Sequence, residues 1–250
     1  VLVTSHMLST TTFDLLFAMV LSWLLLRWLS TRNQRLWLVM GAVLGIGLWN
    51  KYVLLLIAIG LIGGLLIAGP RDVLRTIWPY AGAGLALLIW LPNLVWQAVN
   101  GWPQLDMAGE ISSQGEFGGR LGAIPFQFLL VGPPIAVIMV AGLVRLLRTP
   151  DARLFRSLGW AYLIVLGLVL LSGGKPYYSL GLAPVLFGAG GVAVERWLAR
   201  GRARHRGTLV AAAFASSSTS AASRIEIAEL AAAYADSAAA VQLAPAAGES

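Results

Sequence analysis

Long apolar blocks occupy the first 200 residues of the chain, and short polar or arginine-rich segments separate them. A helix needs about 20 mostly apolar residues to cross a hydrocarbon core roughly 30 Å thick. We therefore predict spans over residues 13–30, 36–50, 52–68, 77–98, 124–147, 157–173 and 178–196. The pattern indicates an all-α fold, a polytopic transmembrane helical bundle with about seven spans in this chain.

Two polar interruptions divide the longest apolar stretches. As one helix, the block 36–68 would be about 50 Å long at 1.5 Å per residue, so it must turn at Asn50-Lys51, its only polar point. Both arms are short, and we expect the tip to lie below the membrane surface, in a cavity. A second turn is predicted at 173–176, Gly-Gly-Lys-Pro, because glycine and proline break helices. We also expect Pro133-Pro134 to kink the fifth span and a short helix around 103–111.

Composition supports a membrane protein. Hydrophobic residues make up 58% of the chain and charged residues 12%, against about 45–50% and 25% in soluble domains. The chain has no cysteine, which excludes a disulfide framework, a thiolate metal site and a cysteine nucleophile. We also find no P-loop, dinucleotide-binding fingerprint or nucleophile elbow.

The basic residues show a consistent sidedness. The net charge is +7, which could suggest a nucleic-acid partner. The arginines, however, cluster after the first, third, fifth and seventh predicted spans, and membrane topology explains this placement better than nucleic-acid binding does. The clusters are Arg27, Arg32 and Arg35; Arg71 and Arg75; Arg145, Arg148, Arg153 and Arg156; and Arg196, Arg200, Arg202, Arg204 and Arg206. With seven spans all four lie on one face, which the positive-inside rule makes cytoplasmic. The only two lysines, Lys51 and Lys175, and the 99–123 loop would then face outward.

The character of the chain changes after Arg206. We assign residues 1–206 to a membrane domain and 207–250 to an Ala/Ser-rich tail, predicted to be disordered with one short helix.

Asp14 is the sharpest candidate for chemistry, since it lies at the outer end of the first span. An ionisable group at membrane depth usually faces a polar cavity or a partner. The alternative is a helix N-terminal carboxylate next to Ser9 and Thr10, favoured by the helix dipole. His6 nearby is a substrate-binding candidate or an ordinary interfacial residue.

The two lysines are candidates for binding a phosphate. An ammonium group is a compact point charge that suits phosphate, so Lys51 and Lys175 predict a lipid phosphate entering from the bilayer. The alternative is snorkelling, in which the stem is buried and the amine reaches water. Tyr177 and Tyr178 would hydrogen-bond to a sugar or stack on it, or would be interfacial anchors.

Four motifs together resemble a known family. They are "HMLSTTTFDLL", "GLWNKYVLLL", "LPNLVWQAVNGWPQL" and "GGKPYYSLGLAP". In this order, over roughly residues 5–200, they resemble bacterial members of the dolichyl-phosphate-mannose:protein mannosyltransferase family, integral-membrane GT-C glycosyltransferases similar to the aminoarabinose transferase of lipid A. The resemblance implies transfer of a sugar from a polyprenyl-phosphate donor to a glycan, lipid or protein acceptor. Transfer would take place at the outer face of the cytoplasmic (plasma) membrane, with inversion at the anomeric carbon.

The resemblance also implies roles for single residues. The family's main catalytic aspartate, in its first outer loop, is expected upstream of Val1. Asp14 resembles the family's second acidic position, at the outer end of a later span. On physical grounds the reaction also needs a carboxylate that takes the acceptor proton or holds a divalent metal. Lys51 resembles the lysine of a "TKG"-like hairpin tip, here Asn-Lys-Tyr. Lys175 with Tyr177 and Tyr178 resembles a "K-P-x-Y" element near the donor phosphate.

Two other classes stay open at this point. A transporter or lipid flippase would also keep charged groups in a membrane cavity, although more naturally at mid-span. An inactive membrane fragment is the other alternative. The polar groups of this chain gather at one face, which favours an enzyme reached from outside.

Overall fold

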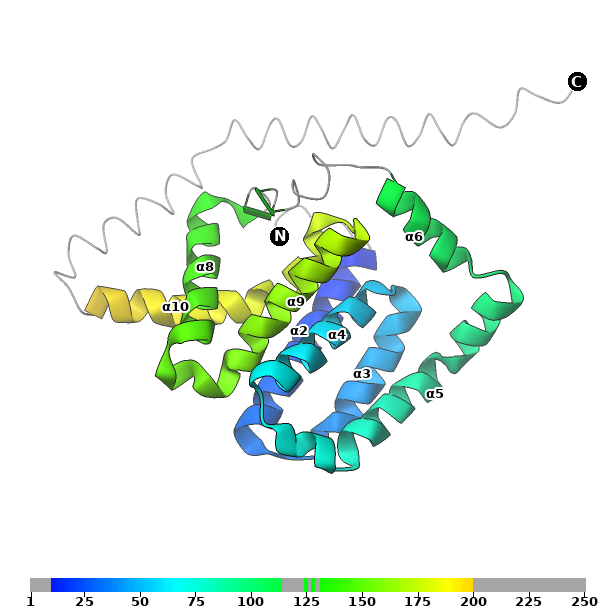
Figure 1. Ribbon diagram of the computed structural model, residues 1–250, viewed down its shortest axis with the longest axis horizontal. Helices are drawn as coiled ribbons and strands as arrows, with labels where there is room; N and C mark the ends of the chain where they lie inside the picture. The colour runs from blue at the N-terminus through cyan, green and yellow to red at the C-terminus, as the bar shows by residue number, and fades with distance from the viewer. Residues whose placement is uncertain (1–9, 114–123, 126, 129–130, 200–250) are drawn as a thin grey trace, which may run out of the picture. The chain divides into compact units, whose positions relative to one another are not determined.

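The computed structural model describes residues 10–113, 124–125, 127–128 and 131–199, and this part of the chain is helical (Figure 1). The all-α prediction is confirmed. The α-helices are α2 (Thr10–Thr31), α3 (Leu36–Asn50), α4 (Val53–Ala68), α5 (Trp78–Val99), α6 (Pro103–Ser113), α8 (Pro133–Arg148), α9 (Arg156–Ser172) and α10 (Ala183–Ala199). Three short 3₁₀ helices connect them: η1 (Arg71–Arg75), η2 (Pro150–Phe155) and η3 (Pro176–Leu182). The predicted tail lies outside the described residues, as does His6.

Several helices have the length and composition of membrane spans. Among the described residues, four helical segments qualify: Thr12–Thr31, Trp78–Val99, Pro150–Ser172 and Tyr177–Trp197. Helices α3 and α4 are apolar but shorter, with 15 and 16 residues. The protein is therefore a multi-pass helical membrane protein. The predicted break between 36–50 and 52–68 is confirmed, and each arm is shorter than the roughly 20 residues that a full crossing requires.

The fifth predicted span differs from the expectation. Helix α8 begins only at Pro133, directly after Gly132, whose φ of 82° lies in the left-handed region. Pro133 and Pro134 thus occupy the first turn, where the missing N–H group of proline costs no helical hydrogen bond. The two prolines start this helix, and the prediction that they kink it was wrong.

Three helix pairs pack closely through glycine: α3 with α5, α4 with α9, and α8 with α10. At each contact a Cβ atom in place of the glycine hydrogen would collide with the partner's backbone. The contacts are Gly41 on Gly82, Gly64 on Ser157 and Ala161, and Gly142 on Leu186 and Gly190. Small residues let helices approach closely where lipid removes the hydrophobic driving force for association.

Helix α2 packs against α3, α4 and η3. Its buried face includes Leu21, Leu25 and Trp28, and the Trp28 ring meets the edge of Trp37 in α3 with centroids 5.3 Å apart. This packing leaves the first turns of α2, with Asp14, beside the α3–α4 turn and η3.

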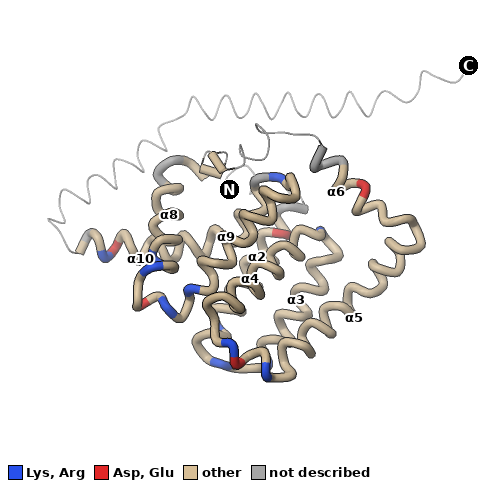
Figure 2. Tube along the Cα trace, in the orientation of Figure 1, with Lys and Arg blue, Asp and Glu red and all other residues tan. Residues whose placement is uncertain are grey.

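The arginines of the described residues stand at or near the ends of helices, where charged residues gather in Figure 2. Arg32 pairs with Asp72 of η1, with their nearest charged atoms 3.9 Å apart. Asp151 of η2 accepts hydrogen bonds from Arg145 of α8, over 2.7 Å, and from Arg196 of α10. The Arg32–Asp72 and Arg196–Asp151 pairs connect elements that are about 40 or more residues apart in sequence.

Candidate functional site

Asp14 is buried in α2, with 7% of its surface exposed, and the α3–α4 turn holds both of its carboxylate oxygens. The amide of Asn50 donates a hydrogen bond to Oδ1 over 2.6 Å, and the Lys51 ammonium lies 3.8 Å from Oδ2. A buried charge is costly unless it is paired and hydrogen-bonded. This geometry favours a partnered carboxylate over one that only complements the helix dipole.

The α3–α4 turn is short, because only Lys51 and Tyr52 separate the two helices. Asn50 is the last residue of α3, and Lys51 is extended (φ −163°, ψ 141°), although its N–H group still bonds to the Gly47 carbonyl over 3.3 Å. Tyr52 then leads into α4. We call Asn50-Lys51-Tyr52 the hairpin tip.

Lys51 lies between Asp14 and two aromatic rings. Its Nζ atom is 5.3 Å from the ring centre of Tyr178 and 5.8 Å from that of Tyr177, and the two rings meet edge to face. A cation within about 6 Å of a ring face is attracted to it. The Lys51 side chain remains 27% exposed, so a ligand can reach it.

The Gly-Gly-Lys-Pro segment brings the tyrosines to this place. Helix α9 ends at Gly173, whose φ of 67° is a left-handed conformation that favours glycine. Pro176 then begins η3. Further along η3, Gly181 packs on α2, where a Cβ would lie 2.8 Å from that of Ala18. The predicted helix break at 173–176 is confirmed. It is followed by η3, whose Gly181 lies against Ala18, one helical turn after Asp14 in α2.

The structure thus brings together four of the six residues selected from the sequence: Asp14, Lys51, Tyr177 and Tyr178. Lys175 stands two residues before Tyr177, directly before η3, and is half-buried.

Three polar residues at the site were missed by sequence reasoning: Asn50, Tyr52 and Asn93. Besides the bond from Asn50 to Asp14, the Tyr52 hydroxyl donates to Asn93 Oδ1 in α5 over 2.7 Å. The Tyr52 ring also meets the Trp90 ring edge to face, with centroids 5.2 Å apart. These residues could have been found by the signal that singled out Asp14, which is a polar side chain within an apolar run.

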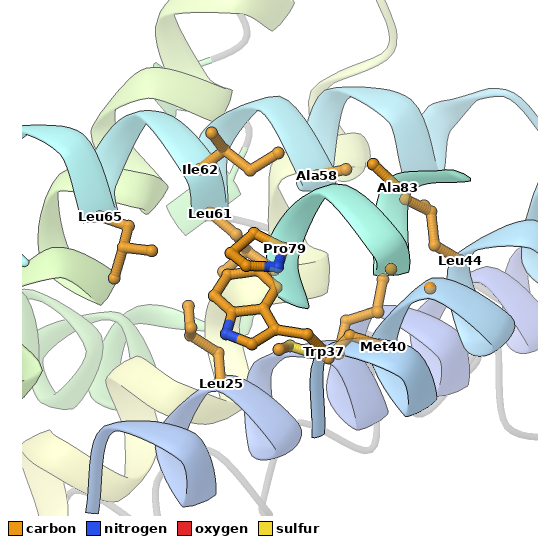
Figure 3. Close-up of a pocket in the computed structure, with 13 residues that line it drawn as sticks. Leu25, Trp37, Met40, Leu44, Ala58, Leu61, Ile62, Leu65, Pro79 and Ala83 are labelled. Atoms are coloured by element: carbon orange, nitrogen blue, oxygen red, sulfur yellow. The ribbon is translucent and has the colours of Figure 1, made fainter. Parts of the chain in front are cut away.

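An apolar cavity of about 90 Å³ lies between α2, α3, α4 and α5 (Figure 3). Its walls include Leu25, Trp37, Met40, Leu61, Ile62 and Pro79, and none of its lining residues is ionisable. The lining begins on α2 at Leu21, about 10 Å along the helix from Asp14. This cavity can hold apolar groups but supplies no acid or base.

The acidic residue at the site does not form a metal centre by itself. Across the part of the chain that the structure describes, no three His, Asp or Glu side chains gather as metal ligands. Asp14 is one carboxylate with an ammonium 3.8 Å away, and that positive charge disfavours a second cation.

Comparison with known proteins finds a family similarity over the first part of the chain. Residues 1–96 match the family model of dolichyl-phosphate-mannose-protein mannosyltransferase, and this range includes Asp14, the hairpin tip and Asn93. No curated protein and no solved structure matches the chain significantly. Over this range the predicted resemblance is confirmed: residues 1–96 are similar to the dolichyl-phosphate-mannose-protein mannosyltransferase family.

Proposed function

We propose that this protein is an integral-membrane glycosyltransferase that moves a sugar from a polyprenyl-phosphate donor to an acceptor at the outer face of the cytoplasmic membrane. The observation that carries the proposal is the meeting of Asp14, Lys51 and the Tyr177–Tyr178 pair at one end of α2. The family match over residues 1–96 supports the reaction class.

Lys51 is the group best placed to meet the donor phosphate. When the glycosidic bond breaks, its electron pair goes to the phosphate oxygen, and the leaving polyprenyl phosphate gains negative charge. A cation that is already fixed in a low-dielectric site stabilises this charge without reorganising. Asp14 and the two rings fix Lys51 in this way, and its 27% exposed side chain leaves room for the phosphate.

Asp14 supplies a negative charge on the acceptor side of the reaction. The acceptor hydroxyl forms the new bond to the anomeric carbon, with inversion, and its proton must pass to a base. By the resemblance, the family's main base is a different aspartate, and Asp14 is the second acidic position. We assign it to orienting the acceptor or sugar hydroxyls and to stabilising positive charge that develops on the sugar ring.

The proposed topology can be tested by chemical labelling, because the chain has no cysteine of its own. We expect single cysteines at Ser113 and Arg148 to react oppositely with a membrane-impermeant thiol reagent. Ser113 should be labelled from outside and Arg148 only after permeabilisation, because the arginine clusters are assigned to the cytoplasm. Equal labelling of both positions from outside would contradict the seven-span arrangement.

Donor binding tests the role of the lysines. We expect Lys51→Ala and Lys175→Ala each to weaken binding of a polyprenyl phosphate by about 5- to 150-fold, which corresponds to about 1–3 kcal/mol for a hydrogen bond to a charged group. Lys175→Arg should also weaken binding, because the planar guanidinium replaces a compact ammonium. Titration of detergent-solubilised protein measures the affinity.

The matched control for this titration is Arg71→Ala, which removes an exposed cation at the start of η1. It should leave the affinity unchanged. Wild-type affinity in both lysine variants would make Lys51 and Lys175 ordinary interfacial lysines, and absence of binding by the unmodified protein would refute the proposed function.

A further inference from the structure

The hairpin tip is fixed from three sides by three consecutive residues. Asn50 bonds to Asp14 in α2, Lys51 lies against the tyrosine rings of η3, and Tyr52 bonds to Asn93 in α5. Each side chain engages a different element, so the tip cannot turn without breaking a contact. The tip therefore has a defined orientation relative to the Asp14 carboxylate.

The hydrogen bond from Asn50 to Asp14 fixes the rotation of the carboxylate. A carboxylate rotates about a broad, two-fold torsion, so its oxygens are interchangeable unless something holds one of them. The Asn50 amide holds Oδ1 at 2.6 Å, while Oδ2 stays 3.8 Å from the Lys51 ammonium, at the long end of an ion pair. Asn50 is uncharged, so it fixes the carboxylate without neutralising it.

We propose that Asn50 is a positioning residue for Asp14, which holds Oδ1 so that Oδ2 stays on the Lys51 side without closing a tight ion pair. This inference rests on the proposed function, since it concerns how the two charges of that site are kept available. Lys51 then remains able to meet the donor phosphate, and Asp14 keeps an oxygen that a substrate hydroxyl can reach.

Tyr52 offers a contrast within the same tip. Its hydroxyl bond to Asn93 has a similar length, 2.7 Å, and anchors the tip to α5. If the tip matters only as a packed turn, loss of either bond should disturb the site in the same way. If Asn50 positions Asp14, removal of its amide should affect the chemical step specifically.

The experiment compares Asn50→Ala, Tyr52→Phe and Asn100→Ala in the purified full-length protein. Asn100 is the matched control, because it directly follows α5 and its amide donates a 2.7 Å bond to the Trp96 carbonyl of that helix. We expect Asn50→Ala to lower turnover at saturating donor by about 10-fold or more, with polyprenyl-phosphate affinity within about 3-fold of the wild type. Asn100→Ala should change neither quantity.

Equal effects of Asn50→Ala and Tyr52→Phe on turnover and affinity would overturn the proposal, as would wild-type turnover in Asn50→Ala.

A pH profile gives a second test. Asn50→Asp places a carboxyl group at hydrogen-bond distance from Asp14, and among the described residues Lys51 and Tyr178 also interact with Asp14. Two adjacent carboxyl groups can share one proton, which restores a donor to Oδ1, but they repel each other when both are ionised. Turnover of Asn50→Asp relative to the wild type should therefore rise on acidification. A pH profile parallel to that of the wild type would overturn the proposal.

Infrared spectroscopy separates this inference from the proposed function. The carboxylate band of Asp14 can be identified as the signal that is lost in Asp14→Asn. We expect this band to shift in Asn50→Ala and to stay in place in Asn100→Ala, whether or not the protein transfers sugar. An unshifted band would refute the positioning role alone, whereas a shifted band in a protein that binds no polyprenyl phosphate would refute the proposed function alone.

Discussion

Asp14→Asn should reduce sugar transfer by about 100-fold or more, the range for loss of a positioned acid–base or charge-stabilising group. The substitution keeps the shape of the side chain and removes its charge. The protein should stay folded in the membrane, because Lys51 keeps its contacts with Tyr177 and Tyr178 and is partly exposed. Transfer from a polyprenyl-phosphate sugar by purified variants measures the effect, with thermal unfolding as the check on folding.

The matched control for that experiment is Asp106→Asn. Asp106 is exposed in the first turn of α6, so the same chemical change there should leave the rate unaltered. A wild-type rate in Asp14→Asn would show that the Asp14 carboxylate serves only to stabilise the helix dipole at the N-terminal end of α2.

Gly64→Ala should give the largest loss of stability among single-methyl substitutions in the α4–α9 pair. The added Cβ would collide with the Ser157 carbonyl and with backbone atoms of Ala161. Backbone cannot rotate away as a flexible side chain can, so the helices must separate. We expect a loss of about 2–3 kcal/mol, at the upper end for overpacking, seen as a lower unfolding midpoint in detergent.

Gly167→Ala tests this explanation in the same helix pair. Gly167 lies in α9, and a Cβ there would meet no atom within 4 Å. Alanine has a higher helix propensity than glycine, by about 1 kcal/mol, so the unfolding midpoint should stay the same or rise. If both variants lost stability equally, backbone contact at Gly64 would not be the cause.

Helix positions could be predicted where apolar blocks were long and their interruptions were strong helix breakers. The turns at Asn50-Lys51 and at Gly173–Pro176 both appear in the structure. The start of α8 was missed because an apolar run does not show where a helix begins within it. Proline marks either a kink or a first turn, and the left-handed Gly132 that decides between them cannot be identified from periodicity.

The candidate site could be predicted residue by residue, but not as an assembly. Asp14 and Lys51 were selected because an ionisable group at membrane depth costs free energy and usually faces a polar cavity or a partner. The tyrosines were selected because they follow Lys175 at the end of an apolar run. Their meeting depends on η3 packing against α2, which follows from Gly181 lying on Ala18. Asn50 and Asn93 were overlooked because an uncharged amide next to a turn or a proline is common, and its partner is visible only in three dimensions.

The glycine contact between α4 and α9 also bears on the order in which the protein is made. Gly64 leaves the ribosome about ninety residues before Ser157, its partner across the contact, an interval of about 5–20 s at usual rates of synthesis. The partners of α3 come sooner, since Gly41 meets Gly82. The small-residue face of α4 must therefore wait in the insertion machinery or against lipid until α9 arrives. The candidate site is completed later still, once Tyr178 has been added.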